Sequence, residues 1–146
     1  MNIVIGNNTL KQGTSGNITG KIFVEVDDYY FPEENWNDFP IIILSCWINN
    51  YLNSRRSKVG KFEMCFMDGP FLLKGELVDN ELYKIKLIGR ELENTGQELE
   101  TYLTSKEIQE MFLKASRKIL REAELSCISQ EKLQGLKKIL KELKNL

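Results

Sequence analysis

The chain has 146 residues, of which 42% are hydrophobic and 28% charged, and its formal net charge is −1. This is the composition of an ordinary soluble globular domain, long enough to bury one hydrophobic core. A near-neutral total argues against a general nucleic-acid binder, which normally carries an excess of basic residues.

The chain contains no histidine, and this narrows the possible chemistry. Serine–histidine and cysteine–histidine catalytic arrangements are excluded, as is zinc ligation by histidine. Cys46, Cys65 and Cys127 are odd in number and far apart, which fits neither a disulfide framework nor a cysteine-only zinc site. We expect three reduced, mostly buried thiols. Without a secretory signal or an apolar run of bilayer length, the sequence predicts a cytoplasmic protein with no membrane contact. We also predict no cofactor.

Two strands are predicted near the N-terminus, "NIVI" at 2–5 and "KIFVEV" at 21–26. The connection "GTSGNITGK" at 13–21 looks like a phosphate-binding loop at first sight. It lacks the required glycine, where Ser15 stands, and the required serine or threonine, where Ile22 stands. A strand also follows it, so no helix N-terminus is available for phosphates. We expect a flexible surface connection there.

An acidic, aromatic loop comes next. Six carboxylates and no basic residue lie between Lys21 and Arg55, and four rings are threaded among the acids: Tyr29, Tyr30, Phe31 and Trp36. Because Tyr29 and Tyr30 are neighbours in an extended segment, one of them should face solvent. The alternative is that most of the rings turn inward to cover the following helix and leave the acids in water.

A buried helix is predicted over 41–52, because apolar residues recur there at spacings of three and four. A side-chain oxygen of Asp38 or Asn37 would cap its N-terminus, with Pro40 in the first turn. The segment "SRRSKVG" at 54–60 is interpreted as a polar, basic connector.

Three strands of an antiparallel meander are predicted after this connector, at 61–66, 71–77 and 82–88. Gly69-Pro70 and Asp79-Asn80 supply the two turns between them.

The last third of the chain is predicted to be helical. Thr104 and Glu107 form a capping-box pattern that starts one helix, "SCIS" at 126–129 ends it, and a final helix begins near Gln130. The final helix has a leucine face and a lysine face: Leu133, Leu136, Leu140 and Leu143, against Lys137, Lys138, Lys141 and Lys144. The expected fold class is therefore α+β, an antiparallel meander sheet packed against three helices in a single domain spanning 1–146.

The acidic aromatic loop is the best candidate for a functional site. Tyrosine and tryptophan dominate binding hot spots, while carboxylates steer a basic partner inward and repel nucleic-acid phosphates. Adjacent acids in an extended segment point in different directions, which spoils a converging metal site. We predict no catalytic residue, no metal ligand and no direct nucleic-acid binding. The predicted partner-binding residues are Asp28, Tyr30, Glu33, Glu34 and Trp36.

Residues 29–52, "YYFPEENWNDFPIIILSCWINNYL", followed by "FMDGPF" at 66–71, resemble the immunity proteins of bacterial contact-dependent inhibition and polymorphic-toxin systems. The likeness rests on Phe31-Pro32, Trp36, Asp38-Phe39-Pro40, Trp47 and Asp68-Gly69-Pro70. It implies a small, non-enzymatic cytoplasmic protein that binds the toxic C-terminal domain of a cognate toxin, often a nuclease, and blocks its active site or substrate entry.

Two other functions stay open on the sequence. One is a carboxylate-dependent enzyme, such as a metal-assisted hydrolase acting through Asp27 or Asp28. The other is an adaptor or assembly protein that dimerises through its C-terminal helices.

Overall fold

The N-terminal sheet is organised around one long strand, β3 (Ile18–Val26). The computed structural model describes residues 1–146, with the side chain of Glu91 left out. Four short strands pair with β3, all antiparallel: β1 (Asn2–Ile5), β2 (Lys11–Gln12), β4 (Tyr29–Phe31) and β5 (Asn37–Asp38). The two predicted strands are confirmed, although the second begins earlier than predicted, at Ile18.

A second antiparallel sheet follows the order β6-β7-β8-β9: β6 (Lys61–Cys65), β7 (Leu72–Asp79), β8 (Leu82–Ile88) and β9 (Leu99–Thr104). The predicted meander is confirmed, and β9 extends it by one strand. Alternate side chains such as Phe62, Met64, Leu73, Tyr83 and Ile85 are buried on one face. The opposite face carries ion pairs between strands, including Lys61 with Glu76 and Lys74 with Glu63.

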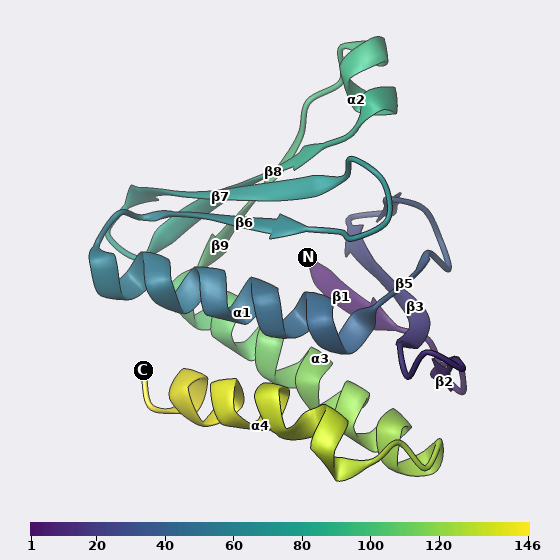
Figure 1. The fold of residues 1–146 in the computed structure, drawn as a ribbon. Coiled ribbons are helices and arrows are strands. Elements are labelled where there is room, and N and C mark those ends of the chain that lie inside the picture. The colour runs from purple at the N-terminus through teal and green to yellow at the C-terminus, as the bar shows by residue number, and fades with distance from the viewer.

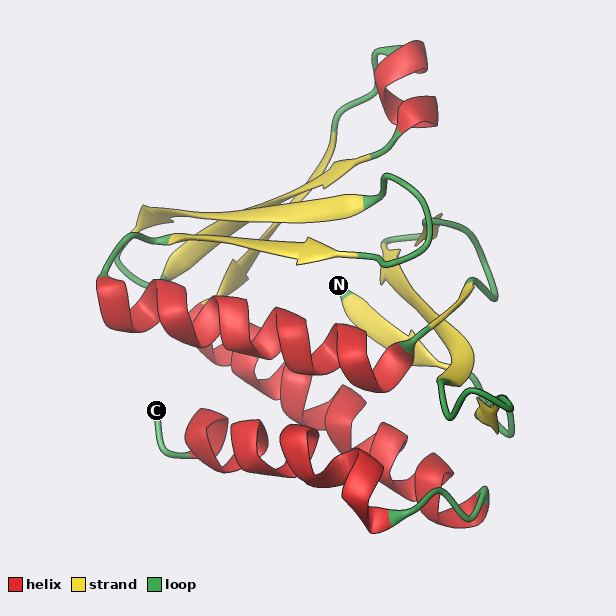
Figure 2. Ribbon diagram, in the orientation of Figure 1, coloured by secondary structure: helices red, strands yellow, loops and turns green.

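Two long helices cover the buried face of this second sheet, α1 (Pro40–Ser57) and α3 (Ser105–Leu125), and a third, α4 (Gln130–Lys144), packs against these two helices. Figure 1 shows α1 and α3 beneath the sheet and α4 on their far side. A short helix that the sequence did not predict, α2 (Arg90–Thr95), joins β8 to β9 and stands away from the body of the molecule (Figure 2). The expected α+β class, an antiparallel sheet packed with helices, is confirmed.

The predicted start of α1 is only partly correct. Pro40 occupies the first turn as expected, but the N-cap residue is Phe39 and no side chain caps the helix. Asp38 is instead a buried residue of β5, and its Oδ1 accepts a hydrogen bond from the Phe39 N–H at 2.9 Å. Asn37 is an exposed residue of the same strand. The Asp38 carboxylate therefore accepts a hydrogen bond from the N–H of the N-cap residue and not from one of the free N–H groups in the first turn of the helix.

The predicted connector at 54–60 is wrong, because α1 continues to Ser57 and ends where Lys58 adopts a left-handed conformation. Long-range contacts extend the helix through this polar segment. Arg55 Nη1 lies 2.8 Å from a carboxylate oxygen of Glu81, and Arg56 Nη2 lies 2.5 Å from one of Glu142. Residues distant in the sequence thus contact the last turn of α1.

The two C-terminal helices begin as predicted. Thr104 Oγ1 accepts a hydrogen bond from the Glu107 N–H, and a Glu107 carboxylate oxygen accepts one from the Thr104 N–H at 2.7 Å. In α4 the lysine face is exposed, whereas the whole leucine face is buried: Leu133, Leu136, Leu140 and Leu143. These leucines pack within the chain against α1 and α3, so they are not presented for self-association.

The three cysteines are free thiols, as expected, but all three are exposed rather than buried. Cys46 lies on the solvent side of α1, Cys65 on that of β6, and Cys127 between α3 and α4. Partial burial nevertheless raises the pKa of the Cys65 thiol, which lowers its thiolate population at neutral pH. Among the residues described, every helix is too short or too polar to cross a bilayer.

A buried carboxylate joins the N-terminal hairpin to α3. Glu122 is 3% exposed; its Oε2 accepts the Asn8 backbone N–H at 2.8 Å and its Oε1 lies 3.0 Å from Lys118 Nζ. The Asn8 N–H, and secondly Lys118, lower the pKa of Glu122 below its ordinary value. A carboxylate with a lowered pKa stabilises the fold at neutral pH and loses that contribution in acid.

We predict that Glu122→Gln lowers the free energy of unfolding at pH 7 by about 2 kcal/mol, because a charged acceptor of a backbone hydrogen bond is lost. The difference between wild type and variant should shrink as pH falls below the ordinary glutamate pKa of about 4.3, because the pKa of Glu122 is lower still in the folded protein and the carboxylate is protonated progressively below that point. Urea denaturation at several pH values measures both effects. Glu124→Gln, at an exposed position of the same helix, is the matched control and should behave as wild type. A gap that stays constant down to pH 3 would contradict this prediction.

Candidate partner-binding surface

Two segments that are distant in the sequence form the candidate site. One is the loop 27–38, which contains β4 and β5, and the other is the turn 66–71 between β6 and β7. Figure 1 shows both at the end of the molecule where α1 begins. We call residues 27–38 and 66–71 together the acidic aromatic surface. The two parts of the immunity-protein resemblance, 29–52 and 66–71, therefore meet in space.

The carboxylate of Asp38 holds the two segments together. It is 2% exposed, and its Oδ2 accepts three hydrogen bonds of 3.1 Å each, from Trp36 Nε1 and from the backbone N–H groups of Met67 and Asp68. With the bond from the Phe39 N–H to Oδ1, one side chain accepts four hydrogen bonds. A buried carboxylate is tolerated only when it is satisfied in this way.

Aromatic rings reinforce the same junction. Phe31 meets Phe66 and Phe71 edge to face, with ring centroids 6.0 and 5.9 Å apart. Trp36 meets Phe71 edge to face at 5.2 Å. Such arrangements suit the charge distribution of aromatic rings and fix their orientation. Phe31 is buried, while Trp36 and Phe71 are half-buried, so one side of these last two rings reaches the surface.

The five predicted contact residues differ in how far they face solvent. Asp28, Glu33 and Glu34 are exposed, and Tyr30 is 39% exposed with its ring edge-on to Phe23 at 5.7 Å. Trp36 is half-buried, since its ring packs on Phe71 and its Nε1 donates to Asp38. As the sequence predicted, one ring of the Tyr29–Tyr30 pair faces outward, and it is Tyr30. Phe31 is the ring that turns fully inward.

The exposed carboxylates form two pairs rather than one cluster. Asp27 and Asp28 occupy the turn before β4, and Glu33 and Glu34 follow it, so five residue steps, at most about 16 Å of extended chain, separate Asp28 from Glu33. No ion pair recorded among the described side chains involves any of these four acids. Their negative charge is therefore uncompensated and spread over a distance comparable with the Debye length at physiological salt.

Two exposed apolar side chains, one within this surface and one in the helix that follows it, were not recognised in the sequence. Met67 is 56% exposed beside the amide that binds Asp38, and Ile42 is 51% exposed in the first turn of α1. In the sequence Ile42 looks like one more residue of a buried apolar run. Its position on the helix, opposite Ile41 and Ile43, which are buried, is what exposes it.

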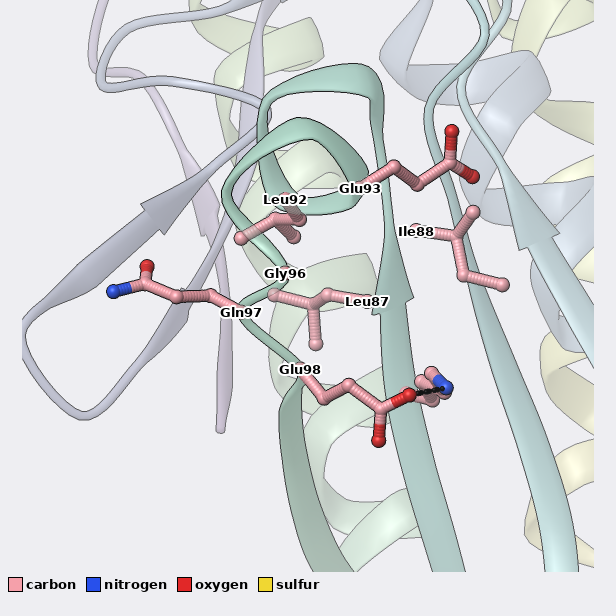
Figure 3. A pocket seen from close by; sticks show the side chains of 8 residues that line it. Leu87, Ile88, Leu92, Glu93, Gly96, Gln97 and Glu98 are labelled. Atoms are coloured by element: carbon pink, nitrogen blue, oxygen red, sulfur yellow. Dashed lines mark hydrogen bonds and ion pairs between the residues drawn. The ribbon is translucent and has the colours of Figure 1, made fainter.

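A separate hollow of about 320 Å³ lies beside α2 and is drawn in Figure 3. The side chains of Leu87 and Leu92 form its apolar part, and Glu93 and Glu98 point in different directions (Figure 3). Glu98 lies 2.6 Å from Lys86 Nζ, and this contact lowers the pKa of Glu98. A catalytic general acid needs a raised pKa and a converging partner, so this hollow provides no carboxylate pair for acid–base chemistry.

Across the described part of the chain, no three His, Cys, Asp or Glu side chains come together in a group that could hold a metal ion. No protein-family model matches the chain, and no curated protein or solved structure is significantly similar to it. Function is therefore inferred from the geometry and charge of the acidic aromatic surface.

We predict that Asp38→Asn lowers the free energy of unfolding by about 2–3 kcal/mol, because an amide cannot accept all four hydrogen bonds. It should also speed hydrogen exchange at the Met67 and Asp68 amides, since the turn 66–71 loses its anchor. Asp28→Asn, at an exposed position of the same loop, should change stability by less than about 0.5 kcal/mol. Unchanged exchange at both amides in the Asp38 variant would show that the carboxylate does not hold the turn.

Proposed function

We propose that this protein is a non-enzymatic binding protein that docks a basic protein on the acidic aromatic surface, as an immunity protein docks its toxin. The observation that carries the proposal is the set of four exposed carboxylates, Asp27, Asp28, Glu33 and Glu34, without an ion-pair partner in the described structure. Elsewhere among the described residues some exposed acids are paired with lysine or arginine and others, such as Asp79 and Glu124, are not; these four differ because they lie within eight residues of one another in a stretch without any basic residue. Uncompensated charge destabilises the isolated protein slightly, so a partner of opposite sign explains its presence.

The surface has the composition of a binding site. Tyr30 offers an exposed ring at its centre, between the two carboxylate pairs, while Met67 and Ile42 offer apolar contacts at its border. Aromatic and methionine side chains are enriched in the cores of protein interfaces, and surrounding charges set the rate and specificity of association.

The surface is also held in a fixed shape before any partner arrives. The four hydrogen bonds to Asp38 and the ring contacts of Phe71 connect the loop 27–38 to a turn of the second sheet. A preorganised surface loses less conformational entropy on binding, so more of the contact energy becomes affinity.

Charge decides the class of partner. Nucleic acid would be repelled by four uncompensated carboxylates, whereas a surface that binds nucleic-acid phosphates would be attracted to them. A nuclease toxin domain has such a basic surface, and an acidic protein seated on it would exclude the substrate. The proposed partner is accordingly the toxic C-terminal domain of a cognate toxin, with inhibition by occupation of its substrate surface.

We predict that the double variant Glu33→Lys/Glu34→Lys associates with the toxin domain about tenfold more slowly at low salt, because electrostatic steering is lost. The toxin domain would be obtained by co-purification with the product of the adjacent gene. Stopped-flow mixing at increasing salt measures the effect, and the gap between wild type and variant should close as salt is raised.

The matched control for this experiment carries Asp79→Lys and Glu124→Lys, which make the same change in net charge at exposed positions outside the acidic aromatic surface. Its association rate should fall much less. Equal slowing by both double variants would mean that net charge, and not this surface, guides the partner. If the product of the adjacent gene does not bind at all, the proposal that the partner is a cognate toxin domain is contradicted.

We predict further that Tyr30→Ala raises the dissociation constant for the same partner at least about tenfold, mainly through faster dissociation. The Tyr30 ring also packs edge-on against Phe23, so its truncation should lower the thermal midpoint of the free protein by a few degrees, and binding is measured well below that midpoint. Surface plasmon resonance gives both rates. A variant that binds as tightly as wild type would place the ring outside the interface.

A further inference from the structure

The two edge strands of the four-stranded sheet, β6 and β9, differ in whether their outward backbone groups have hydrogen-bond partners. In antiparallel strands the backbone groups of alternate residues point outward, so the recorded bonds show which groups these are. Next to β6, the Leu77 N–H donates to the Gly60 carbonyl and the Phe66 N–H donates to the Phe71 carbonyl. These two bonds establish which residues of β6 direct their backbone groups toward β7. The backbone groups of Glu63 and Cys65 consequently point outward. Asn50 Nδ2 donates to the Glu63 carbonyl at 2.9 Å, and Trp47 Nε1 donates to the Cys65 carbonyl at 2.8 Å. Side chains of α1 therefore bind two of the outward carbonyl groups at the β6 edge.

The opposite edge, β9, is open. A bond of 2.8 Å from Ser105 N–H to the Glu81 carbonyl sets the alternation there, so Glu100, Tyr102 and Thr104 direct their backbone groups away from β8. The Thr104 N–H is taken by Glu107 in the capping box. In the part of the chain that the structure describes, the outward N–H and carbonyl groups of Glu100 and Tyr102 have no recorded partner. Both residues are exposed, Tyr102 by 52%.

The sequence of this edge, "LETYL" at 99–103, is complementary to itself. When two copies are laid antiparallel with Thr101 opposite Thr101, the outward groups of Glu100 face those of Tyr102 in the second copy, and the reverse. This single register forms four backbone hydrogen bonds and uses all the open groups of both residues on each copy. On the uncovered face of the sheet it sets Glu100 opposite a tyrosine, so no like charges are opposed across the join.

The other face of the same register also matches. Leu99 would lie opposite Leu103 of the second copy, with threonine opposite threonine between the two leucine pairs, and such cross-strand pairs stabilise sheets. Below this edge is a hollow of about 250 Å³, lined by Met1, Leu103 and Met111 together with charged side chains of α3. The hollow gives space for side chains of an added strand that point toward the helices.

We propose that a second copy of this chain adds to the outer edge of β9, giving a two-fold symmetric dimer with one continuous eight-stranded sheet. An isologous contact of this kind requires a self-complementary surface, and a net charge of −1 offers little repulsion between copies. The leucine face of α4 takes no part, because it is buried within each chain. This inference does not depend on the proposed partner of the acidic aromatic surface.

Sedimentation velocity of the wild-type protein, over concentrations up to roughly 1 mM, should show a reversible monomer–dimer equilibrium. Tyr102→Glu should weaken the dimer about tenfold, because it opposes two carboxylates twice across the symmetric join. Within one chain the new carboxylate lies opposite Lys84, so the variant should fold normally, as circular dichroism would verify. Adding Glu100→Lys to Tyr102→Glu opposes unlike charges across the join and should restore dimerisation; because position 100 lies opposite Lys86 within the chain, circular dichroism must show that the double variant also folds.

The matched control is Val78→Glu, which adds the same carboxylate at an exposed position of β7 away from the join and should dimerise like wild type. A wild-type protein that stays monomeric at the highest concentration would overturn the proposal. So would a dimer whose dissociation constant is the same in the wild-type and Tyr102→Glu proteins, or a double variant that dimerises no better than Tyr102→Glu alone.

Discussion

The hydrogen bonds accepted by Asp38 are the interaction on which the shape of the acidic aromatic surface depends. One buried carboxylate joins the loop 27–38 to the turn 66–71 and so couples the N-terminal sheet to the meander sheet. Burying a charge is costly, and the cost is offset only because four donors converge on it. With this anchor in place the outward acids and Tyr30 project from a rigid support rather than from a mobile loop. The hydrogen bonds of a buried side chain thus fix the positions of the exposed acids and of the Tyr30 ring.

Charge on this molecule is sorted by region, although its total is close to zero. The uncovered face of the meander sheet is nearly self-compensating, because Lys61, Lys74 and Lys86 each pair with a glutamate. The lysine face of α4 is exposed and basic, while the acidic aromatic surface is unpaired and negative. A partner approaching from solution therefore experiences opposite fields on different sides. Regional sorting of this kind gives orientation as well as attraction.

Local patterns in the sequence predicted most of the elements. The alternation in β6 to β8, the spacing of apolar residues in α1 and the capping box of α3 each encode their structure within a few neighbouring residues. The misses depended on distant contacts. The polar residues on the exposed face of β9 do not indicate a strand by themselves, and β9 is identified by its pairing with β8. The last turn of α1 contacts Glu81 and Glu142 through ion pairs. The outward ring of Tyr30 was predictable from strand alternation. The role of Asp38 was not, because two of its donors lie about thirty residues away.

The finished edge of β6 has a consequence for assembly. Any sheet with two open edges can accept a neighbour on each side, and repetition then produces a filament without a natural end. Here Asn50 and Trp47 of α1 donate to the outward carbonyls of Glu63 and Cys65, so two acceptors that a strand added at β6 would need are already bound. A strand that adds at β6 must displace these two hydrogen bonds, whereas one that adds at β9 displaces none, so the two edges of the sheet are not equivalent as sites of strand addition.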